Sequence, residues 1–582
     1  MSISERLGLL QAAQGQPAKL ALATVDLAYS ALSELERSAI REGLEAAAVP
    51  HWCDPPIVAS LLAIHEAESV ALVTRLQSLS IVEPFPARGE KVVNVHEASR
   101  LAIRKWLAAE QEERFRELSA RAAALFVGDS TSSGRIEWIY HFLSADPERA
   151  ATALEKLDRE WSNQVQPEDR YALAAALKEL EDTEMVSGRA RVWVQLAIAW
   201  TRASRGEHAF LADKAAEIIK LAHISKDKRA EGDAHWLAGD AYMAQGRVED
   251  ARKAYHRNLE ISRKLAKQEP SNGGWQRELA VAHALVAGVL RERGKASEAE
   301  RACQEAITIL RQLLQESPGH PVWVQDLGGI LLQMSDMVQT RGLLTDAETL
   351  IKESLGLQES LAEKDPTNAV WQLNLALGHS RMGDVLQAQQ KMAQAETAFV
   401  KARALSEHLA SLDPTHAGWQ LRLSVAFNRV GNLFLLQHRL SQAQEQFEKS
   451  LAITRSLTLN NPMSAVWQRE LAVALSRVSD VLYAQDKFDE ARVLLEESVA
   501  IHRQLTAKDP TRVEWQQDLA WACVQAGRLL LKTDRNAAGV FYDEAIAIMA
   551  ALAREHGSEK IRTDKTAFEK ERADVLGTAR PD

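Results

Sequence analysis

Hydrophobic residues over most of the chain recur every three to four positions, which is the spacing of one face of a helix. In the segment 371–418 this pattern predicts a first helix over about 371–389 and a second over about 393–412. Asp413-Pro414 is expected to end the second helix, because proline has no backbone N–H and the residue before a proline avoids the helical region. The segment is therefore expected to form a helical hairpin.

The hairpin pattern repeats at a fixed interval of 48 residues. A tryptophan opens each first helix: Trp275, Trp323, Trp371, Trp419, Trp467 and Trp515. A proline precedes each of these helices: Pro270, Pro318, Pro366, Pro414, Pro462 and Pro510. A small residue stands in each second helix: Ala251, Ala299, Ala347, Ala395, Ala443 and Ala491. A period in this range is typical of a solenoid, whose units bury their apolar faces on one another and present a long surface.

Two further sets of residues belong to the same register. A hydroxyl residue after the proline is expected to cap the next first helix: Thr367, Thr415, Ser464 and Thr511. A small residue within the first helix is expected to let the two helices of a hairpin approach closely: Gly383, Gly431, Ser479 and Gly527.

The spacing of Gly383, Ala395, Phe399 and Ala402 resembles the small–Ala–Phe–Ala pattern of tetratricopeptide repeats (TPRs). The resemblance implies an all-α fold, a TPR-like α-solenoid of about eight helical hairpins over 187–552. The usual period of this family is about 34 residues. Longer helices are therefore expected here.

The first 186 residues lack the 48-residue pattern. Three helices followed by a β-hairpin are expected, which is the outline of a small winged-helix-like module. The predicted elements are helices over about 18–32, 33–48, 56–65 and 68–79, strands at 80–83 and 91–95, a long helix over about 97–127, a linker at 128–134 and further helices over 136–182.

Three stretches, 79–84, 95–100 and 137–141, resemble the winged helix and following helical segment of bacterial STAND-type signalling ATPases, the relatives of NLR proteins. The resemblance covers about 25–160. No nucleotide-binding domain precedes these stretches, so the ATPase domain of that family is expected to be absent. His96 is accordingly expected to be a structural, hydrogen-bonding residue rather than a nucleotide sensor.

These patterns together predict five parts of the chain. They are an N-terminal tail at 1–18, the winged-helix-like module at 19–110, a helical connector at 111–186, the hairpins at 187–552 with the 48-residue period from 227, and a C-terminal capping helix and tail at 553–582.

Composition narrows the functional classes. The 582 residues carry a net charge of −10 with a pI near 6.0, which gives no general attraction to nucleic acid or anionic lipid. Only Cys53, Cys303 and Cys523 are present, which favours a reducing compartment, and Cys303 is expected to be a buried packing residue. Neither a secretory signal nor an apolar run of about 18–20 residues is apparent, so a cytoplasmic location without membrane contact is expected.

Motifs for catalysis, cofactors and metals are incomplete. The segment 288–297 resembles a phosphate loop, but five residues separate its glycines and an alanine stands between Lys295 and Ser297. Glu137 and His141 share one helix face, which predicts a local ion pair rather than a metal site because no third ligand accompanies them. We therefore expect no enzymatic activity, no cofactor and no metal.

DNA binding is the main alternative, because a winged helix could make the protein a transcription regulator with a TPR sensor domain. The recognition helix of such a module would be 68–79, which holds one basic residue, Arg75, and the wing adds only Arg88 and Lys91. Phosphate contacts dominate affinity for DNA, so this set is too small to favour nucleic acid.

The first helices are expected to line the concave face, where polar residues recur ten and thirteen positions after the tryptophan. The candidate partner-binding residues are Arg381, Asp384, Asn428, Arg429, Asn432, Arg477, Asp480 and Tyr483. They resemble the clamp with which some TPR proteins hold a peptide's terminal carboxylate, although no lysine precedes the arginines. A structural ladder, in which each arginine bonds its own i+3 partner or the next repeat, is the competing interpretation.

The sequence thus predicts a non-enzymatic, cytoplasmic protein-binding scaffold or sensor of a bacterial signalling or defence system. Its expected partner is a protein or peptide held on the concave face, with a separately encoded ATPase or effector as the candidate. An accessory subunit that regulates an effector enzyme such as a protease is a further alternative to the transcription regulator.

Overall fold

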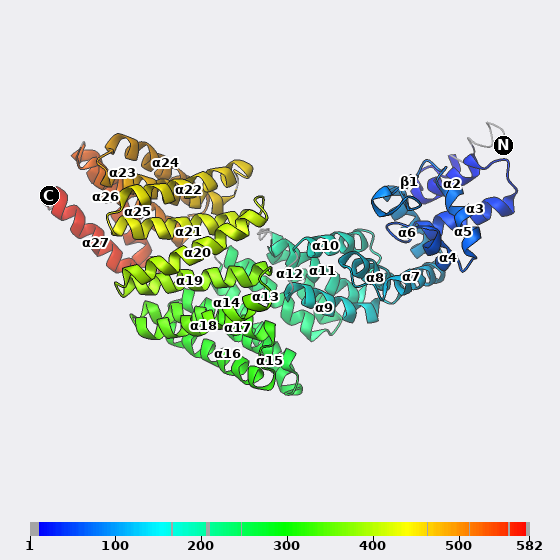
Figure 1. Ribbon diagram of the computed structural model, residues 1–582, viewed down its shortest axis with the longest axis horizontal. Helices are drawn as coiled ribbons and strands as arrows, with labels where there is room; N and C mark the ends of the chain where they lie inside the picture. The colour runs from blue at the N-terminus through cyan, green and yellow to red at the C-terminus, as the bar shows by residue number, and fades with distance from the viewer. Residues whose placement is uncertain are drawn as a thin grey trace. The chain divides into compact units, whose positions relative to one another are not determined.

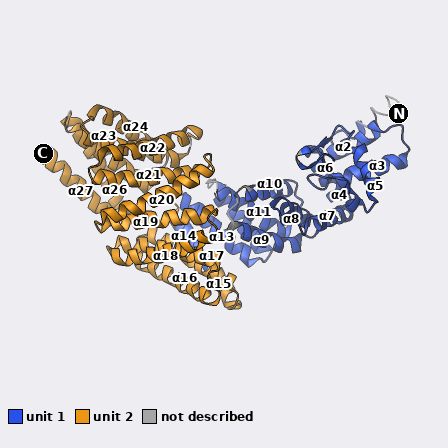
Figure 2. Ribbon diagram, viewed as in Figure 1, with its two compact units in different colours: residues 1–245, 249–261 blue, residues 246–248, 262–582 orange. Residues whose placement is uncertain are grey.

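The computed structural model shows a chain that is almost entirely helical (Figure 1). It describes residues 8, 11–163, 167–204, 210–245, 247–462, 464–510, 512–532, 534–556 and 559–577. The chain forms two compact units, one of residues 1–245 and 249–261 and the other of residues 246–248 and 262–582 (Figure 2). The five-part division expected from the sequence stays a prediction.

From Pro17 to Val95, the described elements of the first unit are four helices and a β-hairpin with a short turn of helix inside it. The elements are α2 (Pro17–Ala28), α3 (Glu34–Ala47), α4 (Pro55–Leu62), α5 (Glu66–Leu76), β1 (Val82–Pro84), the 3-10 turn η1 (Pro86–Arg88) and β2 (Val93–Val95). The strands are antiparallel and pair Val82 with Val95, and Cys53 adds a single bridge to Val93. The expected helices and hairpin are confirmed, while the winged-helix assignment stays a prediction.

The prediction of one long helix over 97–127 is wrong. It is broken at Gln111, which ends α6 (Glu97–Glu110) and begins α7 (Glu112–Phe126) with the non-helical angles φ −139° and ψ 52°. No glycine or proline marks this break, so tertiary packing decides it: α6 packs on α2, whereas α7 packs on α4 and α8 and buries Phe115. The linker at 128–134 is also shorter than expected, because the next helix begins at Ser132.

Seven helices continue the chain toward the second unit. They are α8 (Ser132–Ala145), α9 (Pro147–Asn163), α10 (Pro167–Asp182), α11 (Gly188–Ser204), α12 (Leu211–Ile224), α13 (Lys228–Ala244) and α14 (Val248–Gln268). Their apolar faces form one core around Leu154, Leu177, Val194 and Leu237.

The second unit is a stack of helical hairpins. First helices are α15 (Gly273–Glu292), α17 (Pro321–Thr340), α19 (Ala369–Ala388), α21 (Ala417–Leu436), α23 (Ala465–Ala484) and α25 (Val513–Leu530). Second helices are α16 (Ala296–Glu316), α18 (Leu344–Lys364), α20 (Met392–Leu412), α22 (Leu440–Asn460), α24 (Phe488–Lys508) and α26 (Arg535–His556). From α15 to α24, first helices have 20 residues and second helices 21, and the turns complete the 48-residue period.

Small residues set the distance between the two helices of a hairpin, as expected. A Cβ atom added to Gly383 would lie 2.4 Å from the ring of Phe399, and one added to Gly431 would lie 2.6 Å from the ring of Phe447. The alanine of this register is fully buried in α14 and in the second helices from α16 to α24: Ala251, Ala299, Ala347, Ala395, Ala443 and Ala491. Cys303 is likewise fully buried, and burial raises the pKa of its thiol to about 12.

The repeated Trp-Gln pair ties five of the six first helices to the turn before them, and α17 has Val324 in place of the glutamine. The side-chain Nε2 of Gln372 donates to the carbonyl oxygen of Pro366 at 3.1 Å, and the same bond recurs at Gln276, Gln420, Gln468 and Gln516. Trp371 and Trp515 are buried, whereas the other four tryptophans of the series are half-buried. The tryptophan thus packs at the start of the helix while the glutamine holds the preceding proline.

The capping prediction is wrong for Thr367 and Thr415. The helices begin later, and the caps are Asn368, whose Oδ1 accepts from two backbone N–H groups at 3.2 Å, and His416, whose Nδ1 accepts at 3.1 Å. The two threonine hydroxyls instead donate at 2.6 Å to the aspartate before each proline. Ser464 is a cap as expected, and Thr511 lies outside the described residues.

The stack ends with α27 (Glu559–Leu576), which packs on α26. Contrary to the sequence expectation, the segment Arg535–Arg554 within α26 is long and apolar enough to cross a membrane by length and composition, and α4 and α5 meet this test only as one bent pair. In α26 this composition has a packing role, because Tyr542 and Met549 are fully buried between neighbouring helices.

Candidate partner-binding groove

The first helices of the second unit line one continuous side of the stack. Successive first helices, from α15 to α25, lie closer to one another than successive second helices do, which places the first helices on the inner side of the curve. Three hollows open along this side. One of 530 Å³ lies over α17 and α19, one of 420 Å³ over α19 to α23, and one of 530 Å³ over α23 to α25.

Neighbouring hollows share wall residues. Asp384 and Gln387 line both the first and the second hollow, and Val473 and Arg477 line both the second and the third. We call this row of three hollows the groove. Of the sequence-predicted residues, seven line it: Arg381, Asp384, Asn428, Arg429, Asn432, Arg477 and Asp480.

Tyr483, the eighth predicted residue, is not among the residues that line these hollows. Its ring lies edge-on to Phe488 with 5.5 Å between centroids, and the Lys532 ammonium lies 5.5 Å from the same ring. Tyr483 stands sixteen positions after its tryptophan, the register at which Gln387 lines the groove, so its ring contacts and not its register set it apart. The structure therefore places it with the packing of the inter-helix turn.

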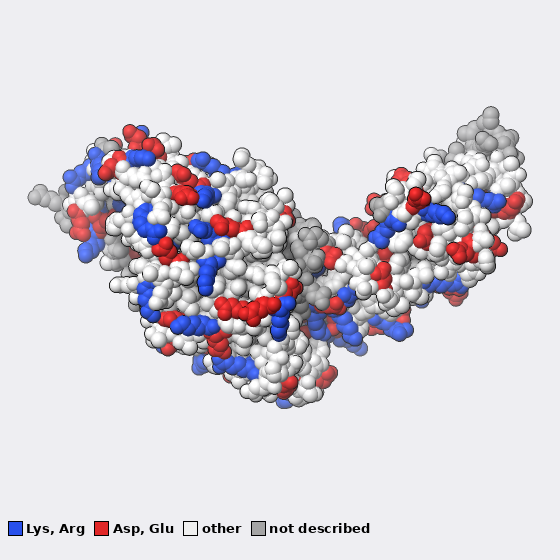
Figure 3. All heavy atoms as spheres, in the orientation of Figure 1, with Lys and Arg blue, Asp and Glu red and all other residues white. Residues whose placement is uncertain are grey.

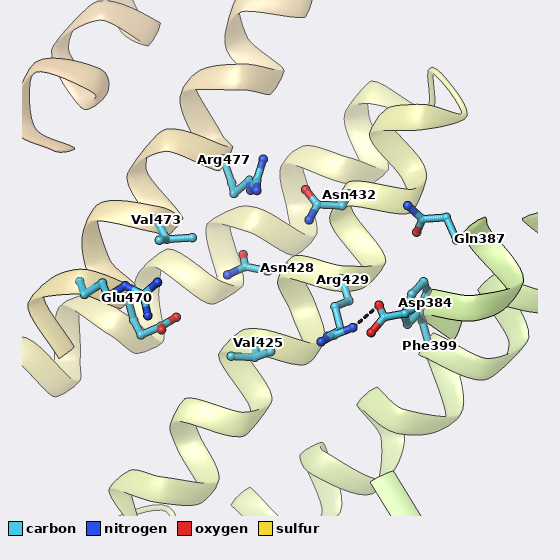
Figure 4. A pocket seen from close by; sticks show the side chains of 11 residues that line it. Asp384, Gln387, Phe399, Val425, Asn428, Arg429, Asn432, Glu470, Val473 and Arg477 are labelled. Atoms are coloured by element: carbon cyan, nitrogen blue, oxygen red, sulfur yellow. Dashed lines mark hydrogen bonds and ion pairs between the residues drawn. The ribbon is translucent and has the colours of Figure 1, made fainter. Parts of the chain in front are cut away.

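Polar side chains link three of the first helices to the one before: α19, α21 and α25. Arg429 forms an ion pair with Asp384 of the preceding hairpin (Figure 4), and Arg381 reaches Asp336 in the same way at 3.2 Å. Gln525 completes the series, because its Nε2 donates to both oxygens of Asp480 at 2.9 and 3.1 Å. We call these cross-hairpin pairs the ladder.

The ladder differs in one respect from the interpretation made from the sequence. Each arginine was expected to bond its own i+3 partner or the next repeat, whereas Arg381 and Arg429 pair with the preceding repeat. The own-helix contacts are longer, with 3.9 Å between Arg381 and Asp384. Asp336 and Gln525 were missed, although both occupy the same register, thirteen and ten positions after Trp323 and Trp515.

Partial burial shapes the electrostatics of these carboxylates. Burial raises the pKa of Asp336, and the guanidinium of Arg381 opposes that rise. Burial likewise raises the pKa of Asp480, against the attraction of Arg477. In both cases burial disfavours the charged carboxylate, and a neighbouring guanidinium opposes that effect.

One step of the ladder lacks a carboxylate. The residue of α21 that corresponds to Asp384 is Asn432, and the arginine that follows it is Arg477. In Figure 4 both side chains extend into the second hollow with no ion pair between them. Arg477 instead contacts Asp480 of its own helix at 3.4 Å, and 39% of its side chain is exposed.

The floor of the second hollow holds a buried amide with an unused acceptor. Asn428 is 8% exposed, and its Oδ1 has no hydrogen-bond partner in the structure. Glu470 and Arg469 line the same hollow. Arg469 pairs with Asp518 of the next hairpin at 2.5 Å, while burial raises the pKa of Glu470. The hollow thus presents arginine forks, one acidic wall and a neutral acceptor.

The other sequence candidates have structural surroundings in the first unit. Glu137 accepts from His51 at 2.7 Å and lies 3.3 Å from His141, so the predicted neighbours are in contact, but at neutral pH the buried imidazole of His141 is uncharged and the contact is not the expected ion pair. Burial lowers the pKa of His141 to about 4. Among the described residues, no group of three or more His, Cys, Asp or Glu side chains could hold a metal ion.

The expectation for His96 is not met by its side chain, which is exposed and caps no backbone group of α6. Its backbone N–H donates to Ile81 at 2.8 Å. Arg88 of the presumed wing is engaged internally, since it bonds Ser133 and lies 4.7 Å from the ring of Trp52.

Comparison with known families identifies the repeat. The model of the tetratricopeptide repeat matches residues 285–322 and 471–509, each of which joins parts of two consecutive helices of the stack. The chain carries tetratricopeptide repeats. No curated protein sequence is significantly similar to it.

Solved structures share the fold of this TPR protein. A signal-transduction ATPase of the STAND class with a TPR sensor, from Pyrococcus horikoshii, matches with a TM-score of 0.50 and 14% identity over 93% of this chain and 72% of that one. The quorum sensor NprR from B. thuringiensis matches with a TM-score of 0.42 and 14% identity over 68% and 99% of the two chains. At this identity the likeness to the ATPase shows a common α-solenoid architecture.

Proposed function

We propose that this TPR protein is a non-enzymatic scaffold that holds an extended segment of a partner protein in the groove. The observation that carries the proposal is the row of three adjoining hollows, which equivalent positions of consecutive first helices line. A row of this kind suits a chain that runs across several repeats, because each repeat offers the same set of contacts one step further along.

The chemistry of the walls supports a polypeptide as the occupant. Arginine forks, carboxylates and amides alternate along the groove, and Val425 and Val473 supply apolar surface between them. Such a mixture can bond a peptide backbone and both signs of side chain. The face of the second unit seen in Figure 3 likewise mixes basic and acidic residues.

The setting that we propose is the cytoplasm of a bacterium, in a signalling or defence system. The shared fold with a signal-transduction ATPase that carries a TPR sensor supports the signalling part of this proposal. A separately encoded ATPase or effector is then the candidate partner. A transcription regulator finds less support, because the presumed wing has its Arg88 bonded within the protein.

A matched pair of variants tests the groove. Val473→Trp would fill the wall between the second and third hollows, whereas Val493→Trp makes the same change on α24 at a side chain that is 62% exposed. The full-length protein and both variants are used to capture partners from the native host, and the captured proteins are quantified by mass spectrometry. Loss of about tenfold or more of one partner with Val473→Trp alone supports the proposal; equal capture by all three proteins contradicts it.

A further inference from the structure

The step of the ladder between α21 and α23 has Asn432 where the neighbouring step has an aspartate. We propose that Arg477, Asn432 and Asn428 receive an acidic residue of an extended peptide, whose carboxylate takes the place that an aspartate fills in the neighbouring repeat. This inference rests on the proposed function of the groove and adds the chemistry of the segment that binds there.

The neighbouring step shows what the site lacks. At α19 and α21 the ladder brings together Arg429 and Asp384, one guanidinium and one carboxylate. One repeat later the guanidinium remains as Arg477, but the carboxylate is replaced by the amide of Asn432. The protein therefore presents an arginine fork in the hollow without the cross-hairpin anion that satisfies Arg381 and Arg429.

The present partner of Arg477 can be given up readily. Its contact with Asp480 is a single 3.4 Å approach within one helix. Asp480 already accepts from Gln525 at both of its oxygens, so it stays bonded when Arg477 turns away. An incoming carboxylate can bond an arginine fork at two points, which a 3.4 Å contact does not match.

Asn428 supplies the second, independent observation. Its side chain is buried beneath the hollow, and its Oδ1 accepts no hydrogen bond. A buried acceptor without a donor is costly, so this atom points to a ligand that carries an N–H group. Glu470 on the opposite wall is also an acceptor when charged, and it cannot serve as that donor.

A peptide meets both requirements at once. Its acidic side chain supplies the carboxylate for Arg477, and the main-chain N–H beside that residue supplies the donor for Asn428. The hollow of 420 Å³ adjoins further hollows on both sides, which allows the peptide to continue in each direction. A small carboxylate would supply the first contact without the second.

Filling the missing step is the sharpest test. Asn432→Asp restores the aspartate of the ladder and should engage Arg477 from within the protein. Asn536→Asp, at an exposed position in the first turn of α26, adds the same charge away from the groove. Arg477→Gln removes the fork itself. Melting temperatures of all three full-length variants establish that they are folded.

The probe is a library of random linear peptides selected on the full-length protein. Each selected peptide is measured by fluorescence anisotropy, together with a copy in which Asp or Glu is replaced by Asn or Gln. We expect the selected peptides to share an acidic residue, and its replacement to weaken binding about tenfold or more. Asn432→Asp and Arg477→Gln should weaken the acidic peptides to a similar extent, and Asn536→Asp should not.

The outcomes separate the two proposals. Peptides that lose affinity with Val473→Trp, but bind regardless of their acidic residue or of Asn432→Asp, would overturn this inference and leave the groove as the partner site. Failure of every selected peptide and host partner to respond to Val473→Trp would overturn both. Unchanged melting temperature with Asn432→Asp and a selective loss of acidic peptides would support both.

Discussion

Arg429 is ion-paired with Asp384, forty-five positions earlier in the chain, so that a charge on one hairpin is neutralised by the hairpin before it. The side chains of both residues are 26% exposed, which places the pair between a surface contact and a buried one. The pair shows how repeats with a common apolar core also carry polar contacts that fix their neighbours' alignment.

The ladder predicts a measurable coupling between these two residues. Arg429→Gln and Asp384→Asn should each lower the stability of the second unit by about 0.5–1 kcal/mol, and the double variant should lose less than the sum. Arg477→Gln is the matched control, because it breaks no cross-hairpin ion pair. Urea denaturation of the four proteins gives the coupling energy. A value near zero would leave the arginines free of a structural role.

Two glycines in helices should respond to alanine in opposite ways. At Gly383 the new methyl group would overlap the ring of Phe399, which is 2% exposed, so Gly383→Ala should cost about 1–3 kcal/mol. At Gly356, an exposed position of α18 with nothing within 4 Å, Gly356→Ala should stabilise the protein by about 0.5–1 kcal/mol. Thermal unfolding compares the two. A drop in melting temperature for both variants would refute the assignment of close approach to Gly383.

Replacing different tryptophans of the series by alanine should lower the free energy of unfolding by different amounts. Trp371 is 9% exposed, packs on Leu361 and donates from Nε1 to Gln325 at 3.1 Å, so Trp371→Ala should cost about 3–5 kcal/mol. Trp419 is half-buried and stacks on His416 with 4.3 Å between ring centroids. Trp419→Ala should therefore cost less than the value expected for a fully buried indole. Denaturation midpoints of the two variants decide the order.

His141 should make the stability of the first unit depend on pH. Its side chain is fully buried, and burial lowers its pKa from the ordinary 6.5 to about 4, although Glu137 opposes that shift. The unfolded chain therefore binds more protons between pH 6.5 and pH 4, and stability should fall as the pH falls through this range, by about 3 kcal/mol at most.

The pH effect is isolated by difference. His141→Gln should flatten the fall in stability between pH 6.5 and pH 4, whereas His223→Gln, at a side chain that is 72% exposed, should leave it in place. Burial lowers the pKa of His51, but the Glu137 carboxylate outweighs that effect and the pKa is raised. His51 therefore contributes stability that is lost as the pH rises through its folded-state pKa, which is the opposite of the effect of His141. A curve for His141→Gln that parallels the unsubstituted protein would exclude His141 as the cause.

The absence of a phosphate loop from the sequence predicts no response to nucleotide. Isothermal titration with ATP or ADP and Mg²⁺ should show no binding in the micromolar range, and no phosphate should be released. His96→Ala is included as a control, since its side chain is exposed and the sequence resemblance to STAND-type ATPases would make it a nucleotide contact. Binding that disappears in His96→Ala would restore the nucleotide-sensor interpretation.

Much of the fold can be predicted from the sequence because the same 48-residue spacing sets the positions of the packing residues in successive hairpins. The interval between Trp371 and Trp419 gives the length of the hairpin, and Gly383 with Phe399 gives its crossing. The break at Gln111 could not be predicted, because no local residue disfavours a helix there and the bend is fixed by what each half packs against. The caps at Asn368 and His416 were missed since two adjacent residues compete for each cap.

The groove was predictable in outline and not in detail. Counting ten and thirteen positions from each tryptophan finds Arg429 and Asp384, but the partner of each depends on how far one hairpin is rotated against the next. In the structure Arg429 pairs with Asp384 of the preceding hairpin rather than with a residue of its own helix. The unused acceptor of Asn428 is a property of its surroundings, which no local pattern encodes.

The bond from the glutamine after the tryptophan to the preceding proline recurs at five of the six junctions, with Val324 in place of the glutamine at the sixth, and this constrains how such a gene can change length. Removing residues 371–418 would join Val370 to Trp419, leave one intact junction with Gln420 bonded to the retained Pro366, and set Arg429 one hairpin after Asp336. A deletion one residue shorter or longer would shift the contacts that cross this junction off their partners. Recombination between repeats can therefore lengthen or shorten the groove by whole hairpins. Each hairpin gained or lost changes the number of hairpins between Asn432 and Arg477 and one end of the stack.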